Sequence, residues 1–131
     1  MIRAHVDAVL ARLRSDSILS DSTFDGQVSG SPARYCVVYA SGGARVSERL
    51  TGRSVFAEFT FTIHSVGSTP EQARLVEERV IAQLLDWTPT IAGRNCRRTV
   101  HAISRPVSMD KDVSPPLFYA VDGFDLTTAP A

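Results

Sequence analysis

The fold of this chain is decided by residues 55–87, which read VFAEFTFTIHSVGSTPEQARLVEERVIAQLLDW. In the first part, apolar and polar side chains alternate from Val55 to Ile63, as in a β-strand with one face on a core. In the second part, apolar side chains recur every three or four residues from Ala73 to Leu84. That spacing predicts an amphipathic helix that lies across the phenylalanine face of the preceding strand.

The start and the end of this helix carry their own signals. Thr69 is a suitable N-cap, Pro70 fits the first helical position, and Gln72 can complete a capping box. Trp87-Thr88-Pro89 is expected to end the helix.

The other segments predict one more helix and four more strands. Apolar residues have helical spacing in the first segment and strand patterns in the others. The helix falls within residues 1–14, and the strands span residues 23–28, 34–40, 97–105 and 117–126. Gly123 predicts a bulge in the last strand.

The resulting order is α-β-β-β-α-β-β, and the 131 residues indicate a single domain over residues 1–131. This order predicts an α+β fold with a mostly antiparallel sheet of about five strands and both helices packed on one face. Residues 34–40 nevertheless carry apolar side chains on both faces. We expect the second face to be covered by another subunit or by the sheet curling on itself.

Composition excludes several classes of protein. Fourteen basic and fourteen acidic residues cancel, so no overall field attracts nucleic acid or an acidic membrane surface. No apolar run approaches the roughly 20 residues that span a bilayer. The N-terminal segment has charges within its apolar stripe, unlike a signal peptide. We therefore expect a chain that acts in solution inside a cell, with reduced cysteines.

No motif predicts a catalytic, cofactor-binding or metal site, and we expect no enzymatic activity. His5 is placed on the polar side of the first helix. His64 and His101 fall on different strands and could be neighbours across the sheet, but no third ligand has a suitable spacing. A set of aspartates lacks the order of a calcium loop and is expected on the solvated surface: Asp110, Asp112, Asp122 and Asp125.

Four pieces of sequence after residue 30 are characteristic in their order and spacing. They are PARYCVVY (residues 32–39), FTFTIHSVGSTPEQA (59–73), AGR (92–94) with SRPV (104–107), and DKDV (110–113) with FYAVD (118–122). In this order they resemble the tail terminator (tail completion) proteins of long, non-contractile-tailed phages, in the version found in phages and prophages of actinobacteria.

The resemblance implies roles for surfaces, because the family has no catalytic motif. It implies a hexameric ring that caps the finished tail tube, stops its polymerisation and joins the head-side connector. The implied partners are copies of this chain, the major tail tube protein and the connector or neck protein, with passive contact to DNA passing through the ring. The implied location is the tail or neck of the virion, after assembly in the host cytoplasm.

Two long charged segments, residues 41–53 and 106–116, and a basic strip around residues 94–105 are the expected contact regions. Ion pairs between proteins, plain solvated surface and nucleic-acid contact remain open for the arginines. The candidate subunit or tube contacts are Arg45, Arg49, Arg53, Arg97, Arg98, Arg105, Asp110, Lys111 and Asp112.

Two other functions remain open. A head-closure or other neck protein would share the ring symmetry. A small α+β hydrolase or ligand-binding domain would instead have a deep pocket with convergent polar groups and a titrating His64 or His101.

Overall fold

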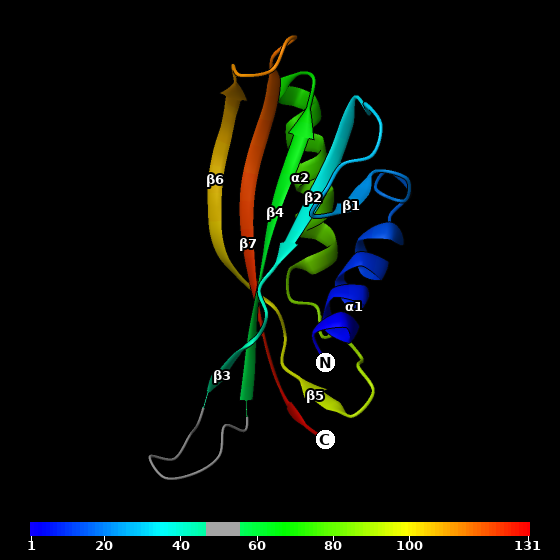
Figure 1. The fold of residues 1–131 in the computed structure, drawn as a ribbon, viewed down its shortest axis with the longest axis vertical. Helices are drawn as coiled ribbons and strands as arrows, with labels where there is room; N and C mark the ends of the chain where they lie inside the picture. Colours follow the sequence, from blue (N-terminus) through cyan, green and yellow to red (C-terminus); the bar gives the residue numbers. More distant parts are fainter. Residues whose placement is uncertain (47–55) are drawn as a thin grey trace.

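The computed structural model describes residues 1–46 and 56–131, and this part holds two helices and a sheet of seven strands (Figure 1). In chain order the elements are α1 (Ile2–Arg14), β1 (Thr23–Asp25), β2 (Arg34–Ala40), β3 (Ala44–Val46), β4 (Phe56–Gly67), α2 (Pro70–Leu84), β5 (Arg94–Cys96), β6 (Val100–Asp110) and β7 (Leu117–Pro130). The predicted α+β class and element order are confirmed. The structure adds two strands of three residues each, β3 and β5.

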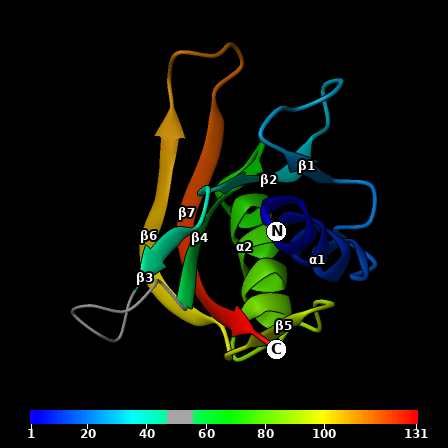
Figure 2. The same ribbon diagram turned by 60° about the horizontal axis from the view of Figure 1, so that its bottom comes forward.

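The strands are arranged in the order β1-β2-β4-β7-β5, with β3 paired to β4 and β6 paired to β7. Among the strand pairings of the described residues, that of β1 with β2 alone is parallel, so the prediction of a mostly antiparallel sheet is confirmed. Figures 1 and 2 show both helices on the same side of the sheet, which bends around α2. The bend covers the helix and leaves the opposite face of the sheet open.

The core lies between the helices and the inner face of β4. Phe59 and Phe61 are at most 1% exposed and belong to one cluster with Val76 and Val80 of α2. The predicted packing of this helix on the phenylalanine face is confirmed. The placement of His5 on the polar side of α1 is wrong, because its ring is fully buried and stacks on Phe59 with 4.0 Å between centroids. Its position one turn before Val9 puts it on the apolar stripe.

The start of α2 has the predicted N-cap. The hydroxyl of Thr69 accepts a hydrogen bond of 3.2 Å from the backbone N–H of Gln72. The side-chain carbonyl of Gln72 returns not to Thr69 but to the backbone N–H of Ser68, at 3.3 Å. Two backbone donors at this end of the helix are therefore satisfied by side chains.

The sequence predicts an irregular connection over residues 106–116. This prediction is wrong for residues 106–110, which belong to β6. Pro106 lies within a register shift between Arg105 and Ser108. Within the described residues β6 pairs only with β7, so it is an edge strand. A proline is tolerated at a bulge on an edge, because its missing N–H leaves no ladder bond unmade.

The bulge predicted at Gly123 lies instead in the neighbouring strand, between His101 and Ile103 of β6. Gly123 itself keeps regular register with Thr62 of β4. A Cβ at this glycine would lie 3.3 Å from the Cβ of Ile103, so the glycine leaves room for the bulged strand. The last strand also extends to Pro130, beyond the predicted end at residue 126.

Candidate interaction surface

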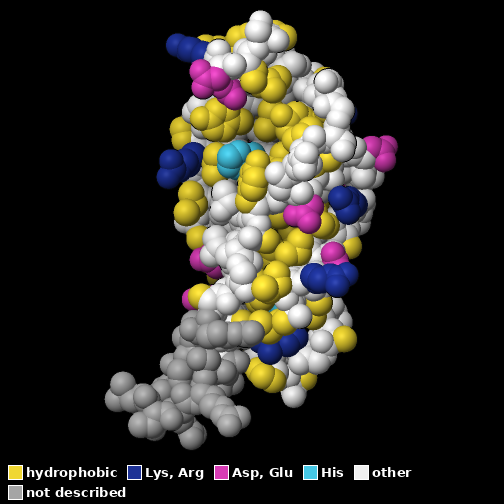
Figure 3. Space-filling model, in the orientation of Figure 1, with side chains coloured by type: hydrophobic (Ala, Val, Ile, Leu, Met, Phe, Trp, Pro, Cys, Tyr) yellow, Lys and Arg dark blue, Asp and Glu magenta, His cyan; other side chains and the backbone are white. Residues whose placement is uncertain are grey.

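The face of the sheet opposite the helices carries a continuous set of aromatic and aliphatic side chains. Register places Val37 of β2, His64 of β4 and Val121 of β7 in one row across three strands. Tyr35 and Tyr119 flank Val66 in the next row of the same face. Figure 3 views this face and shows hydrophobic side chains gathered over its upper half, with a histidine among them.

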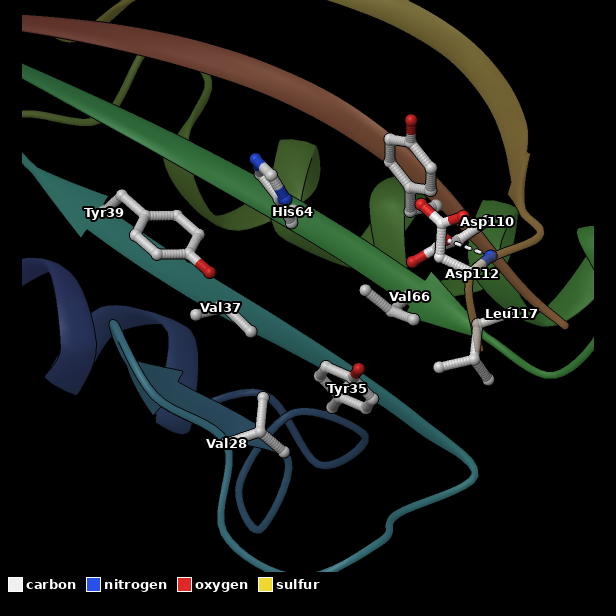
Figure 4. Close-up of a pocket in the computed structure, with 10 residues that line it drawn as sticks. Val28, Tyr35, Val37, Tyr39, His64, Val66, Asp110, Asp112 and Leu117 are labelled. Atoms are coloured by element: carbon white, nitrogen blue, oxygen red, sulfur yellow. Dashed lines mark hydrogen bonds between the residues drawn. The ribbon is translucent and has the colours of Figure 1, made fainter. Parts of the chain in front are cut away.

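A groove of about 430 Å³ is hollowed into this face, between β2 and the turn that joins β6 to β7 (Figure 4). We call it the aromatic groove and define it by Tyr35, Tyr39, His64, Tyr119, Asp110 and Asp112.

The rings of the aromatic groove form a ladder. The Tyr39 and His64 rings meet edge to face with centroids 5.0 Å apart, and His64 lies roughly parallel to the Tyr119 ring at 6.2 Å. Tyr39 keeps 44% of its surface exposed, although it is a large aromatic residue. Several aromatic faces are therefore presented together at one open surface.

The charge of the aromatic groove is negative at one end. Burial lowers the pKa of His64, which favours the neutral ring. Burial raises the pKa of Tyr35, and Tyr39 and Asp110 raise it further, which keeps the phenol protonated. Asp110 and Asp112 lie at the turn, where the Asp110 carboxylate accepts a 3.0 Å hydrogen bond from the backbone N–H of Asp112. Aromatic faces beside carboxylates suit a cationic group.

Among the described residues, the lining of the aromatic groove includes no serine, threonine or cysteine. The lining therefore offers His64 no serine, threonine or cysteine of the kind that the hydrolase alternative would use. His101 lies elsewhere, on the inner face, so the expectation that the two histidines are neighbours across the sheet is wrong. Within the described residues, no three His, Cys, Asp or Glu side chains group so as to hold a metal ion.

The predicted contact residues fall in separate places. The turn between β6 and β7 begins with three of them: Asp110 ends β6, and Lys111 and Asp112 follow it. Arg105 is exposed midway along β6 and lines a second hollow, of about 300 Å³, which shares His64 with the aromatic groove.

The other predicted arginines belong to the opposite end of the sheet. Arg97 and Arg98 lie between β5 and β6, and Arg45 in β3 pairs with Ala57. Arg49 and Arg53 lie outside the described residues.

The guanidinium of Arg97 lies 4.9 Å from the ring centroid of Phe56, at the first residue of β4. Arg98 approaches Asp86 at 3.6 Å, with its own side chain 69% exposed. An exposed pair of this kind contributes little to stability, so Arg98 can exchange its partner. We call Arg97, Arg98 and Phe56 the arginine end.

A buried acidic pair lies on the inner face, and the prediction that Asp122 belongs to the solvated surface is wrong. Asp122 is 0% exposed and accepts a 2.8 Å hydrogen bond from Nε2 of His101. Glu77 of α2 faces it, and among the described residues one buried oxygen of each carboxyl has no geometrically formed hydrogen bond. Burial raises the pKa of Glu77 to about 7, and Asp122 adds to the shift. A protonated Glu77 can donate to Asp122, which gives both oxygens a partner.

The sequence did not lead us to predict the aromatic groove or the pairing of Glu77 with Asp122. Alternation along β7 places Asp122 between Ala120 and Phe124 on the core side, and this signal was available. The meeting of Tyr39, His64 and Tyr119 depends on the register of three strands, which no single segment specifies.

No protein-family model matches the chain, and no curated protein matches it by sequence. Among solved structures, a chain in the virion of a native gene transfer agent (GTA) particle matches with a TM-score of 0.74 and 15% sequence identity, covering 94% of this chain and 92% of that chain. A second solved structure matches with a TM-score of 0.54 and 16% identity, covering 98% of this chain and 92% of its own. The fold is thus shared over nearly the whole chain. Neither described helix is long and apolar enough to cross a membrane.

Proposed function

We propose that this chain is a structural protein of a phage-like virion that caps the tail tube as a ring, stops tail polymerisation and forms the joining surface to the head-side connector. The observation that carries the proposal is the fold shared with a chain of the gene transfer agent virion, with a TM-score of 0.74 over 94% of this chain. The four sequence pieces that resemble tail terminators support the finer role. The ring would be hexameric, as that resemblance implies.

The surface of the subunit supports an assembly role. The open sheet face presents Tyr39 at 44% exposure, and the neighbouring edge strand presents Val100 at 60% and Ile103 at 48%. Apolar side chains gathered on one face and edge are typical of surfaces that another protein covers. The proposed partners are therefore further copies of the chain, the tail tube protein and the connector.

Binding to purified particles separates the tail terminator from the head-closure alternative. A fluorescently labelled chain is expected to co-sediment with purified tail tubes and to decorate one tube end in electron micrographs. Portal–adaptor complexes without tubes serve as the comparison. Binding to those complexes in preference to tubes would assign the chain to the neck instead, and binding to neither would remove the virion proposal.

Reversal of charge at Arg105 tests the exposed edge. Arg105→Glu is expected to weaken binding to tail tubes by about tenfold, because a cation at a protein contact becomes a repulsive anion. Its unfolding midpoint should match that of the unchanged chain, since the side chain is exposed. Arg3→Glu, an exposed arginine on α1, is the matched control. Equal tube affinity for Arg105→Glu and the unchanged chain would exclude Arg105 from the interface.

A further inference from the structure

We propose that the aromatic groove of one copy binds the arginine end of a second copy, and that this contact joins neighbouring subunits head to tail. The proposal rests on the proposed function, because it names the contact that builds the ring. One copy contributes the aromatic rings and the two carboxylates of the groove, and the other copy contributes two exposed guanidinium groups.

The aromatic groove has the chemistry of an arginine site. The rings of Tyr39, His64 and Tyr119 offer flat faces, and Asp110 and Asp112 supply negative charge beside them. A guanidinium stacks on aromatic rings and pairs with carboxylates through its planar fork. Within the described residues the lining contains no arginine or lysine, and Lys111, which stands between the two aspartates in the chain, is exposed outside the lining.

The arginine end has the complementary chemistry. Arg97 already lies over one aromatic ring, that of Phe56, which orders its guanidinium and leaves the residue exposed. Among the described residues, the ion pair of Arg98 is the exposed one with Asp86. One end of the molecule therefore carries two cations, and the opposite end carries two carboxylates.

The two surfaces cannot meet within one molecule. Phe56 begins β4 and Val66, which lines the aromatic groove, lies ten residues further along the same strand. At about 3.3 Å per residue, the two surfaces are roughly 30 Å apart. A contact between them requires a second copy. Two different patches that meet in this way form a heterologous interface, which is the type that closes rings.

Cross-linking tests the contact by residue. The double variant Arg97→Lys, Arg98→Lys keeps both charges and supplies amines that a carbodiimide can join to carboxylates. We expect cross-links from position 97 or 98 to Asp110 or Asp112, in the free protein or on tail tubes. Equal mixtures of isotope-labelled and unlabelled chains should yield peptides of mixed label, which identifies links between copies. The absence of these links from both the free and the tube-bound protein would overturn the proposal.

Charge reversal tests the contact by affinity. We expect Asp112→Arg to raise the concentration for half-maximal self-association by at least about tenfold, measured by sedimentation, and Arg97→Glu with Arg98→Glu to do the same. Tyr39→Ala removes a wall of the groove without touching the turn and should act in the same direction. Mixing the two kinds of variant should restore association, because Asp112→Arg keeps the arginine end and the arginine variant keeps the aromatic groove. Arg3→Glu is the control, and its association should be unchanged.

The outcomes separate this contact from the proposed function. If the charge variants cap tail tubes and self-associate like the unchanged chain, the contact is wrong and the capping role stands. If the cross-links form but the unchanged chain binds no tubes, the contact stands and the capping role is wrong. If mixing fails to restore association while each variant folds, the head-to-tail pairing is wrong.

Discussion

Replacement of Gly67 by alanine is expected to lower the free energy of unfolding by about 3 kcal/mol. Gly67 ends β4 where the first turn of α2 crosses it. A Cβ at this position would lie 2.5 Å from the backbone nitrogen of Ala73 and 2.8 Å from the carbonyl carbon of Gln72. The helix backbone cannot move aside cheaply, because the same nitrogen donates a 3.1 Å hydrogen bond to Thr69. Urea unfolding followed by circular dichroism measures the change.

Gly42→Ala is the matched control, because no atom of the described residues lies within 4 Å of the Cβ that it adds. It should change the free energy of unfolding by less than about 0.5 kcal/mol. Similar stabilities for the two alanine variants would contradict the close approach of β4 and α2. That approach sets the position of α2 on the inner face, and therefore which side of the sheet the helix covers.

Replacement of Glu77 by glutamine is expected to stabilise the protein at pH 8 and to leave its stability nearly unchanged at pH 4. The pKa of Glu77 is raised from 4.5 to about 7, so the folded state binds a proton that the unfolded state releases. The stabilisation from this site is complete below pH 4.5 and is lost as the pH rises through 7. The shift corresponds to at most about 3.4 kcal/mol, which solvent around the half-buried side chain reduces to about 1–2 kcal/mol.

The charges around Glu77 set the direction of this effect. Asp122 opposes ionisation of Glu77, whereas Arg74 on the same helix favours it. His101 donates to Asp122 from the other side. Glutamine keeps a donor toward Asp122 and carries no charge, so it resembles the protonated glutamate. Free energies of unfolding at pH 4, 6 and 8 measure the profile.

Glu78→Gln, at the exposed neighbouring position on α2, is the control for the loss of one carboxylate. It should keep the pH profile of the unchanged chain. A wild-type stability that does not fall between pH 5 and pH 8, or a Glu77→Gln profile parallel to it, would show that Glu77 and Asp122 share no proton.

The parts of the fold with local signals could be predicted from the sequence. The periodicity of α1, the cap at Thr69 and the two-sided apolar pattern of residues 34–40 each indicate one element, and β2 has the predicted bounds. Each signal lies within the segment that it specifies, and the local preference of that segment agrees with its tertiary packing.

The parts defined by pairing could not be predicted in the same way. Segments β3 and β5 have three residues each and exist because β4 and β7 extend far enough to pair with them. Strand β6 is exposed along most of its length, so no apolar alternation marks it, and Pro106 suggested an end where the strand only bulges. Edge strands give weak sequence signals because one side of each is solvated.

The candidate contact residues follow the same division. Charge and loop length pointed to Arg97, Asp110 and Asp112 but gave no relation between them. The structure places Arg97 and the two aspartates at opposite ends of the sheet and adds the aromatic ladder around Tyr39, on which the proposed pairing depends.

Deletion of the gene for this chain from the phage or prophage that we expect to carry it tests the proposed capping role most directly. Negative-stain electron microscopy of the induced lysate is expected to show tails of abnormal length without heads, beside full heads without tails. Supply of the unchanged chain from a plasmid should restore joined particles with tails of uniform length. Normal tails joined to heads in the deletion lysate would contradict the account.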